Sequence, residues 1–262
     1  MIITLTTDFG LSDPFVGIMK GVILGIAPDA RLVDITHDIH SYDILEAAFI
    51  LESSYRYFPA NTVHLVVVDP GVGSARRPIA AAANGHKFVA PDNGVLSFVL
   101  ETGPEGASPS TYHLTNASLF LNSISRTFHG RDIFAPAAAH LARGAAIDRV
   151  GPPISDATKR PWPQIRQDGA KTIAAVLRID KFGNIITNIR PERLPTDFRI
   201  CVGDVLITRL CSSYSESKPG EIFAIEGSTG FVELALNQGS ASELLKVRPG
   251  SEIEVESGST NQ

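Results

Sequence analysis

Strand-like and helix-like segments alternate over the first 68 residues, and this alternation constrains the fold more than any other feature of the sequence. Strand patterns cover residues 1–6, 31–35 and 63–68, and helix patterns fill the stretches between them. The third strand is dominated by apolar residues, as expected for a strand that is covered on both faces. A βαβαβ run of this kind predicts a parallel sheet whose crossovers are right-handed.

The ends of several helices can be predicted from capping residues. We expect Ser12 or Asp13 to cap the first helix, with Pro14 in its first turn. The second helix is predicted over residues 42–58, and a further helix over residues 132–143. Two short strands are expected between these helices, so the first half of the chain has the pattern of an α/β domain.

The pattern changes after a proline-rich stretch, residues 151–168, which carries four prolines and no periodicity. Beyond it, short β-like segments with glycine-containing turns predict a small barrel or a sandwich. These segments cover residues 172–179, 200–208, 221–226, 231–236 and 252–256. We therefore predict an N-terminal α/β domain with a mainly parallel sheet between helices (1–160), a linker (161–170) and a β-rich C-terminal domain (171–262).

Charge and composition exclude several classes of protein. The chain has 23 basic and 28 acidic side chains, a formal charge of −5, which argues against a dedicated nucleic-acid-binding protein. The sequence contains no run of about 18 apolar residues that would predict a membrane span. Its start lacks the features of a secretory signal. With only Cys201 and Cys211 as cysteines, we expect a protein of the reducing cytoplasm.

Polar residues follow each of the first three strands. Asp8 follows the first, Thr36 and His37 the second, and Asp69 the third. Because ligands of open α/β sheets bind beyond the carboxyl ends of the strands, we expect these groups to converge at one edge of the sheet. This edge is the predicted functional site.

Two further segments could add chemistry to that edge. In the loop DPGVGSAR, Arg76 follows Asp69 by seven residues, either as a loop salt bridge or as a cation and a carboxylate around a small polar reactant. His129 lies among hydroxyls and donors just before a helix, either as a structural or as a functional histidine. Asp132 is expected to be a helix cap or a first-turn acid.

Two polar loops of the second half have no unique interpretation. DKFGNIITN brings Asp180, Asn184 and Asn188 close together, and in the segment 226–241 a strand ends with Asn237, Gln238, Gly239 and Ser240. Both are typical of turns, and both could bind a base or an amino-acid group. Phosphate-binding and dinucleotide-binding loops and zinc-protease motifs are missing from the sequence, and we predict no metal site.

Seven motifs occur in an order that resembles one family. They are TTDFG, DITHDI, VVVDPGVGS followed by Arg76, APDNG, TFHGRDIFAP, DKFGN and a GS–G–ELA–N segment, between about residues 2 and 256. Together they resemble the S-adenosyl-L-methionine (SAM) hydroxide adenosyltransferases, long known as the domain-of-unknown-function-62 family and related to fluorinases and chlorinases.

The resemblance implies a fold, an assembly and roles for individual residues. The fold implied is an N-terminal α/β domain followed by a C-terminal β-barrel domain. The assembly implied is a homotrimer with sites at subunit interfaces, where the N-terminal domain of one chain faces the C-terminal domain of another. The family's catalytic residues fall on Asp69, Arg76 and His129. The ribose-binding acid falls on Asp8 and the residue packed near the sugar or base on Tyr42. The residues of the methionine and adenine pockets fall on Asp180, Phe182, Asn184, Ser228, Asn237 and Gln238.

The resemblance also implies an activity. SAM would be hydrolysed to adenosine and L-methionine by attack of water or hydroxide on the ribose 5′ carbon, with SAM as substrate and no cofactor. The presence of all three of Asp69, Arg76 and His129 favours water over halide as the nucleophile. A halide-using, chlorinase-like adenosyltransferase and a non-catalytic adenosine or SAM sensor are the alternatives.

Overall fold

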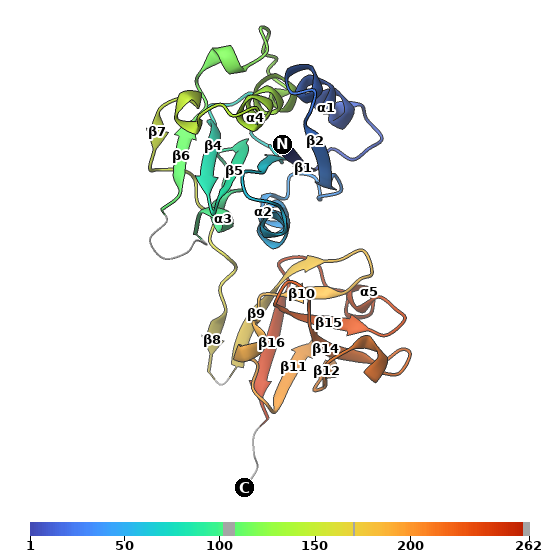
Figure 1. The fold of residues 1–262 in the computed structure, drawn as a ribbon. Coiled ribbons are helices and arrows are strands. Elements are labelled where there is room, and N and C mark those ends of the chain that lie inside the picture. The colour runs from blue at the N-terminus through green and yellow to red at the C-terminus, as the bar shows by residue number, and fades with distance from the viewer. Residues whose placement is uncertain (102–107, 170, 259–262) are drawn as a thin grey trace. The chain divides into compact units, whose positions relative to one another are not determined.

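The structure is a computed structural model that describes residues 1–101, 108–169 and 171–258. Its contacts divide the chain into two compact units, Met1–Arg160 and Pro161–Gln262, which are described separately (Figure 1). No helix within the described ranges is both long and apolar enough to cross a membrane.

The first unit is built on a seven-stranded sheet with the strand order β2-β1-β3-β5-β4-β6-β7. The strands from β2 to β5 pair in parallel, and those from β5 to β7 pair antiparallel. The predicted parallel βαβαβ arrangement is therefore confirmed and is extended by an antiparallel half. The strands are β1 (Ile2–Thr7), β2 (Arg31–Thr36), β3 (Val63–Val67), β4 (Pro78–Ala83), β5 (His86–Pro91), β6 (Ser110–His113) and β7 (Pro153–Ile154).

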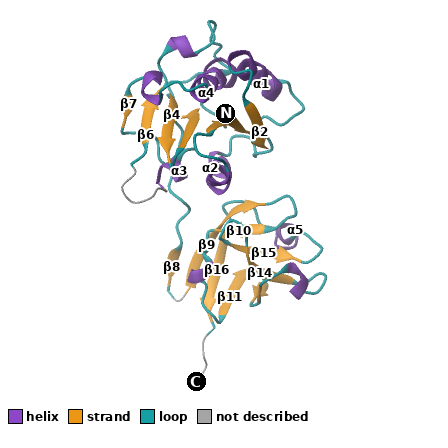
Figure 2. Ribbon diagram, in the orientation of Figure 1, coloured by secondary structure: helices purple, strands orange, loops and turns teal. Residues whose placement is uncertain are grey.

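Helices cover both faces of this sheet, as expected for an α/β unit. Figures 1 and 2 show α1 and α4 on one face and α2 and α3 on the other. Shorter helical turns connect them, including a π-helical turn, η3, that leads directly into α4. The helices are α1 (Phe15–Ile26), α2 (Ile44–Ser54), α3 (Ser97–Glu101), α4 (Ala135–Ala142), η1 (Tyr55–Tyr57), η2 (Ala117–Leu119), η3 (Gly130–Phe134) and η4 (Ile147–Val150).

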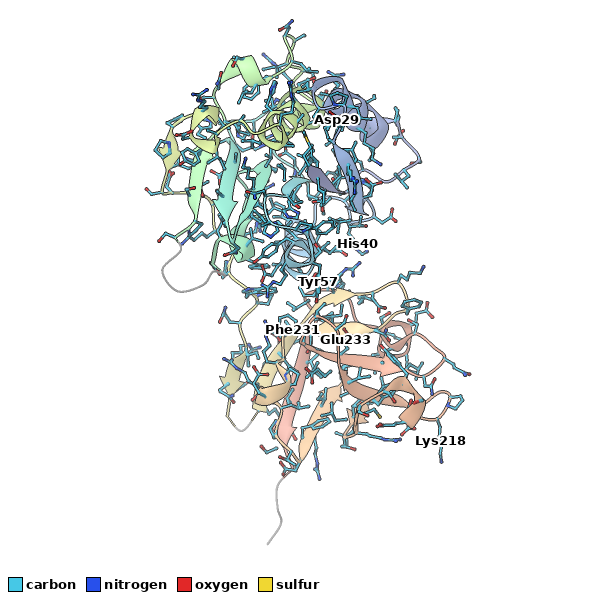
Figure 3. The ribbon with its side chains drawn as sticks, viewed as in Figure 1. Asp29, His40, Tyr57, Lys218, Phe231 and Glu233 are labelled. Atoms are coloured by element: carbon cyan, nitrogen blue, oxygen red, sulfur yellow. The ribbon has the colours of Figure 1, made fainter. Side chains whose placement is uncertain are left out.

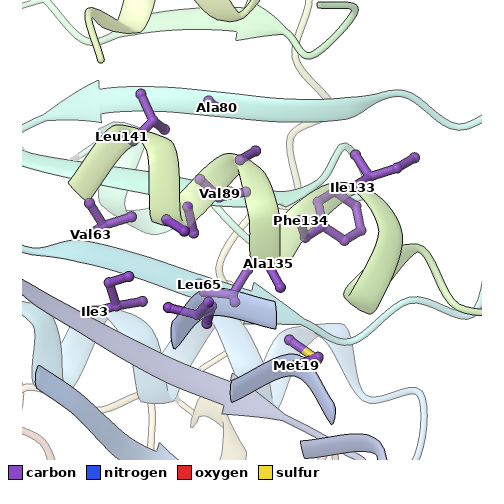
Figure 4. Packing of buried hydrophobic residues seen from close by; sticks show 14 of the residues in the cluster. Ile3, Met19, Val63, Leu65, Ala80, Val89, Ile133, Phe134, Ala135 and Leu141 are labelled. Atoms are coloured by element: carbon purple, nitrogen blue, oxygen red, sulfur yellow. The ribbon is translucent and has the colours of Figure 1, made fainter. Parts of the chain in front are cut away.

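One part of the core of the first unit lies between the sheet and the pair α1 and α4. Ile3 on β1 and Val63 and Leu65 on β3 belong to it and are fully buried (Figure 4). Helix α4 contributes mainly alanines, whose small side chains let it approach the strands closely. This packing holds α4, and the loop that precedes it, against the sheet.

Two predicted helix starts differ from the structure. The first helix starts after Pro14, which takes the N-cap position without a side-chain hydrogen bond, so neither Ser12 nor Asp13 caps it. The second helix starts at Ile44 and not at Tyr42, because Asp43 accepts a hydrogen bond from the Glu46 N–H (2.9 Å) as its N-cap.

The second unit is a nine-stranded sheet curled into a half-barrel, in keeping with the predicted barrel. The long strand β9 causes the curl because residues 171–175 pair with β16 and residues 176–179 pair with β10. The strand order is β12-β11-β16-β9-β10-β15-β14-β13, and β8 also pairs with β9. The strands are β8 (Arg166–Asp168), β9 (Lys171–Ile179), β10 (Ile185–Thr187), β11 (Phe198–Val202), β12 (Val205–Ile207), β13 (Leu210–Cys211), β14 (Ile222–Glu226), β15 (Val232–Leu236) and β16 (Glu252–Ser257). A short helix α5 (Ala241–Leu245) and the turns η5 (Pro191–Arg193) and η6 (Tyr214–Glu216) complete the unit.

Short strands account for the main differences in the second half. The segment 200–208, predicted as one strand, is the hairpin β11–β12, whose turn contains Gly203 at a φ of +58°. The proline-rich stretch 151–168 contains β7 and β8, and β8 lies within the segment 161–170 that we expected to be a linker. Strands of two or three residues show no sequence periodicity, because their pairing depends on neighbours that are distant in the chain.

Candidate functional site

The carboxyl ends of the first three strands meet at one edge of the sheet. In the register, Thr7 pairs with Val67 and Thr6 with Thr36, so Asp8, His37 and Asp69 all follow at the same edge. Thr7 Oγ1 and His37 Nδ1 lie 2.8 Å apart and join the first two strand ends. The predicted convergence of these groups is confirmed.

Asp69 and Arg76 form a bidentate ion pair. Asp69 Oδ1 accepts from Arg76 Nε at 2.8 Å, and Asp69 Oδ2 accepts from Arg76 Nη2. The loop between them folds back tightly at Gly73, whose φ is +76° and where a Cβ would lie 2.3 Å from the carbonyl oxygen of Arg126. Only glycine fits this position, and the turn that it makes brings the guanidinium back to the carboxylate.

His129 contacts the same Arg76 nitrogen, Nη2, that also donates to Asp69 Oδ2. Its Nδ1 lies 2.9 Å from Arg76 Nη2, and because a guanidinium can only donate, Nδ1 accepts. In the neutral ring the proton is therefore on Nε2. Burial, and then the positive charge of Arg76, lower the pKa of His129 below its usual value, while the charge of Asp69 partly offsets this shift. The cluster thus holds a neutral imidazole beside a permanent cation.

One nitrogen of Arg76 has no partner. The side chain is only 9% exposed, and its Nη1 is a buried donor without a hydrogen bond. The Phe134 ring lies 5.0 Å from the guanidinium carbon. Burying an N–H donor without a partner is costly, so this nitrogen is suited to a ligand oxygen.

Asp132 has a larger structural role than the cap or first-turn acid that the sequence predicted. It lies in η3 and is fully buried, and its Oδ2 accepts from the Ser125 N–H at 2.8 Å. Arg131 Nε donates to its Oδ1 at 2.6 Å. These contacts close the loop from Ser125 to Asp132 and so fix the segment that carries His129.

Asp8 and Tyr42 are also brought together. The backbone N–H of Tyr42 donates to Asp8 Oδ2 at 2.9 Å. Tyr42 has a φ of +72°, which is rare for a residue other than glycine, and its side chain is exposed. Such backbone strain persists where the surroundings impose it, and it concentrates at ligand sites.

The second unit contains a cavity of about 840 Å³ that gathers most of the predicted pocket residues. Asp180 organises its floor: Oδ1 accepts from the N–H groups of Phe182 and Asn184, and Oδ2 accepts from Asn184 Nδ2, all within 2.9 Å. Of the predicted residues, the lining includes Asp180, Phe182, Asn184, Ser228 and Gln238.

Asn237, predicted to bind substrate, is not part of the lining. Its amide donates to the Ser217 carbonyl (2.7 Å) and supports the turn that carries Tyr214. The structure adds Tyr214, whose hydroxyl accepts from Asn184 Nδ2 at 3.2 Å. It also adds Glu233 on β15, labelled in Figure 3, where burial and then the charge of Asp180 raise the pKa of the carboxyl group. An acid inside the apolar strand VELAL was the sequence signal for Glu233.

The described residues contain no group of three or more His, Cys, Asp or Glu side chains placed to hold a metal ion. Asp38 and His40, which form a D-x-H pair in the sequence, belong to no such group among these residues, and His40 Nδ1 lies 2.8 Å from Glu46 Oε2.

Comparison with known proteins identifies the family. Models of the N-terminal and C-terminal domains of SAM hydroxide adenosyltransferases match residues 3–151 and 174–254. The chain belongs to this family. Relatives named (R)-S-adenosyl-L-methionine hydrolase are 33–39% identical over nearly their full length. One, from Salinispora tropica, is 39% identical, and the match covers 98% of both chains.

More distant relatives and solved structures complete the comparison. A fluorinase from Nocardia brasiliensis is 28% identical, with 98% of this chain and 97% of the fluorinase covered. An uncharacterized conserved protein from Thermotoga maritima has a similar crystal structure, with a TM-score of 0.89 and 38% identity over 97% of this chain and 99% of that one. The fold described above is therefore the fold of this adenosyltransferase family.

Proposed function

We propose that this SAM hydroxide adenosyltransferase hydrolyses SAM to adenosine and L-methionine. The relatives at 33–39% identity that carry the name of this hydrolase support the proposal. The observation that carries it is the Asp69–Arg76–His129 cluster, with one buried guanidinium donor left for a ligand.

The proposed reaction is a displacement at carbon. The oxygen of water bonds to the ribose 5′ carbon while the bond from that carbon to the sulfonium sulfur breaks. The electron pair stays on sulfur, so methionine leaves as a neutral thioether, and the second proton of the water is released. A neutral leaving group requires no general acid, so the main task of the enzyme is to activate the nucleophile.

In our proposal, Arg76 activates the attacking water. Free water has a pKa near 15.7 and is a poor nucleophile at neutral pH. The Nη1 donor of Arg76 would hold the water oxygen and stabilise its hydroxide-like character. Asp69 would orient the guanidinium and accept a hydrogen bond from the water. Because His129 Nδ1 accepts from Arg76, His129 would position both the guanidinium and the water.

The remaining contacts would place the substrate. Asp8 would bind the ribose hydroxyls, with Tyr42 packed near the sugar or base. The cavity of the second unit is within the usual size range of ligand pockets, about 300–1,000 Å³, and would take the methionine and adenine groups. Holding the water in line with the breaking bond supplies a further rate advantage through proximity.

We further propose that the enzyme is cytoplasmic, needs no cofactor and acts as a homotrimer. Both cysteines are free thiols, which is typical of a reducing compartment. A shared site is testable by mixing two inactive variants, Asp69→Asn and Asn184→Ala. Activity that reappears after subunit exchange would support sites built from two chains, and its absence would contradict them.

One experiment tests the activity. The protein, treated with a chelator, is incubated with SAM with and without chloride or fluoride, and the nucleosides are quantified by chromatography. We expect equal amounts of adenosine and methionine, independent of halide, and none from Asp69→Asn. A 5′-halogenated nucleoside would favour the halide-using alternative. Tight binding without any product would favour a sensor.

A further inference from the structure

The loop that carries Asp69 and Arg76 is fixed at both of its ends by two consecutive residues, Asp92 and Asn93. These belong to the APDNG motif and follow strand β5. In the sheet β5 lies between β3 and β4. The loop leaves the end of β3 and enters β4, so it passes over the end of β5. Asp92 and Asn93, which follow β5, therefore lie beneath the loop that connects β3 to β4.

Asn93 holds the first end. Its Nδ2 donates to the carbonyl of Val68 at 2.8 Å, and this carbonyl belongs to the peptide bond that precedes Asp69. Its Oδ1 accepts from the Val95 N–H at 3.2 Å, which leaves only the NH₂ group to face Val68. The pairing of β3 with β1 ends at Val67, so the Asn93 amide fixes the chain just beyond the strand.

Asp92 holds the second end. Its Oδ2 accepts from Arg77 Nε at 2.8 Å, and its backbone N–H donates to the Arg77 carbonyl at 2.8 Å. Arg77 follows Arg76 directly. The other carboxylate oxygen, Oδ1, accepts from the Thr158 N–H at 2.7 Å, so the acid is buried with both oxygens engaged.

We propose that Asp92 and Asn93 are positioning residues that clamp the two ends of the 69–76 loop and so set the geometry of Asp69, Arg76 and His129. This inference rests on the proposed function for its kinetic readout. The clamp touches neither the guanidinium of Arg76 nor the ring of His129 through any described contact. Its effect reaches them through the backbone of Val68 and Arg77.

The chain offers a matched control in Asn116. Its Oδ1 also accepts from the N–H two residues on, at Ser118 (3.1 Å), and its Nδ2 also donates to a distant carbonyl, that of Arg149 (2.9 Å). Asn116→Ala therefore removes the same two kinds of hydrogen bond as Asn93→Ala, together with one from Ser118 Oγ (2.7 Å), but away from the 69–76 loop.

The test compares Asn93→Ala, Asn93→Asp and Asn116→Ala. We expect kcat for SAM hydrolysis to fall between about tenfold and a hundredfold in both Asn93 variants, since small misplacements of reacting groups have effects of this size. The loss should be larger for Asn93→Asp, which sets a carboxylate oxygen against the Val68 carbonyl. KM should change less than kcat, and Asn116→Ala should retain the kcat of the unmodified enzyme.

A second readout does not depend on catalysis. Because Arg76 helps to lower the pKa of His129, a loosened loop should let that pKa rise toward its usual value in the Asn93 variants and not in Asn116→Ala. NMR titration measures it, with His129→Asn to assign the signal. If the unmodified protein does not hydrolyse SAM, the proposed function fails, and this titration still decides the clamp.

Folding is monitored by thermal unfolding of every variant. If Asn93→Ala does not fold, Arg77→Lys tests the other end of the clamp, since lysine keeps the charge but loses the hydrogen bond from Nε. Folded Asn93 variants with unchanged kcat and unchanged His129 pKa would overturn the inference. The same result would follow if Asn93→Ala and Asn116→Ala lost kcat equally.

Discussion

Two histidine clusters of the first unit, around His64 and around His129, differ in whether their polar atoms have partners. His64 is fully buried on β3, with Nδ1 2.8 Å from Thr4 Oγ1 and Nε2 3.1 Å from His86 Nδ1. Its ring stacks on Phe88 at 5.1 Å. The cluster around His129 instead holds a permanent cation with a free donor.

Both histidines have a lowered pKa, yet only one cluster has the features of a site. Burial and then the neighbouring His86 lower the pKa of His64 to about 3, so this ring is neutral and both of its nitrogens are engaged. A buried histidine with a shifted pKa is therefore no sufficient sign of catalysis. The unpartnered donor beside His129 is the more specific sign, because it leaves a hydrogen bond for a ligand.

In the described residues, buried polar atoms without a hydrogen-bond partner lie at the two candidate ligand sites. Four side-chain atoms are of this kind: Thr6 Oγ1, His37 Nε2, Arg76 Nη1 and Thr229 Oγ1. His37 Nε2 lies 3.1 Å from Asp34 Oδ1, but outside hydrogen-bonding geometry. The first three lie at or near the carboxyl edge of the sheet in the first unit, and Thr229 lines the cavity of the second.

Among the tests of this comparison between the two histidine clusters, the largest effect is expected from removing the free donor of Arg76. Arg76→Ala should lower kcat by about 10²–10³-fold, the usual cost of losing one donor that stabilises charge in a transition state. Adenosine release measures it, with thermal unfolding followed in parallel because Asp69 loses its partner. Arg143→Ala, which removes an exposed arginine bonded to the Ile26 carbonyl, is the control. Turnover near that of the unmodified enzyme in Arg76→Ala would contradict the assigned role.

The His64 cluster should affect stability and its pH dependence. In the unfolded chain a histidine titrates near 6.5, and His64 in the folded protein near 3. Between these values the unfolded state binds one more proton, so stability falls as the pH decreases from about 6.5 toward 3. In His64→Gln, the dependence of the free energy of unfolding on pH in this range should become smaller by up to about 1.4 kcal/mol per pH unit, the contribution of one proton.

Chemical denaturation at a series of pH values measures that slope. At pH 8 the ring is neutral in both states, so any loss of stability there reports the lost packing and hydrogen bonds of His64 and not its ionisation. Turnover at pH 8 should stay close to that of the unmodified enzyme. A slope that is unchanged in His64→Gln would contradict the account of this cluster.

The smallest expected effects concern two threonines of the second unit, one with hydrogen-bond partners and one without. Thr187 Oγ1 donates to the Val232 carbonyl (2.7 Å) and accepts from the Ile189 N–H (3.1 Å), whereas Thr229 Oγ1 has no partner. Thr187→Val should cost about 1–3 kcal/mol, because buried backbone groups lose a partner. Thr229→Val should leave stability unchanged and raise KM about threefold, equivalent to one weak hydrogen bond. Equal losses of stability in Thr187→Val and Thr229→Val would contradict the difference between the two hydroxyl groups.

The sequence predicted those parts of the fold that depend on local patterns. The alternation in residues 1–68 is enough to predict β1 to β3, the crossover helices and the convergence of Asp8, His37 and Asp69. Asp43 was missed as the cap of α2 because a neighbouring tyrosine suited the helix pattern. The strands β6, β7, β8, β10 and β13 were missed because strands of two to four residues show no clear period.

The sequence indicated Asp69, Arg76 and His129 as candidate residues but did not indicate the hydrogen bonds that join them. Arg76 was expected to fold back to Asp69, but its contact with His129, 53 residues on, depends on how η3 packs. Neither the free Nη1 donor nor the clamp of Asp92 and Asn93 has a local sequence signal, because both follow from the order of β3, β5 and β4. Asn237 was expected in the pocket because it is one of the polar residues that follow the strand 231–236 and because it matches the family's motif, but its amide donates to the Ser217 carbonyl.

The central claim is that water attacks the ribose 5′ carbon of SAM in this enzyme. The most direct measurement is to run the reaction in water labelled with the heavy oxygen isotope and to analyse the products by mass spectrometry. The account predicts one heavy oxygen in adenosine and none in methionine, with no product from Asp69→Asn. Unlabelled adenosine, or label in an amino-acid product, would place the bond that breaks elsewhere and would contradict it.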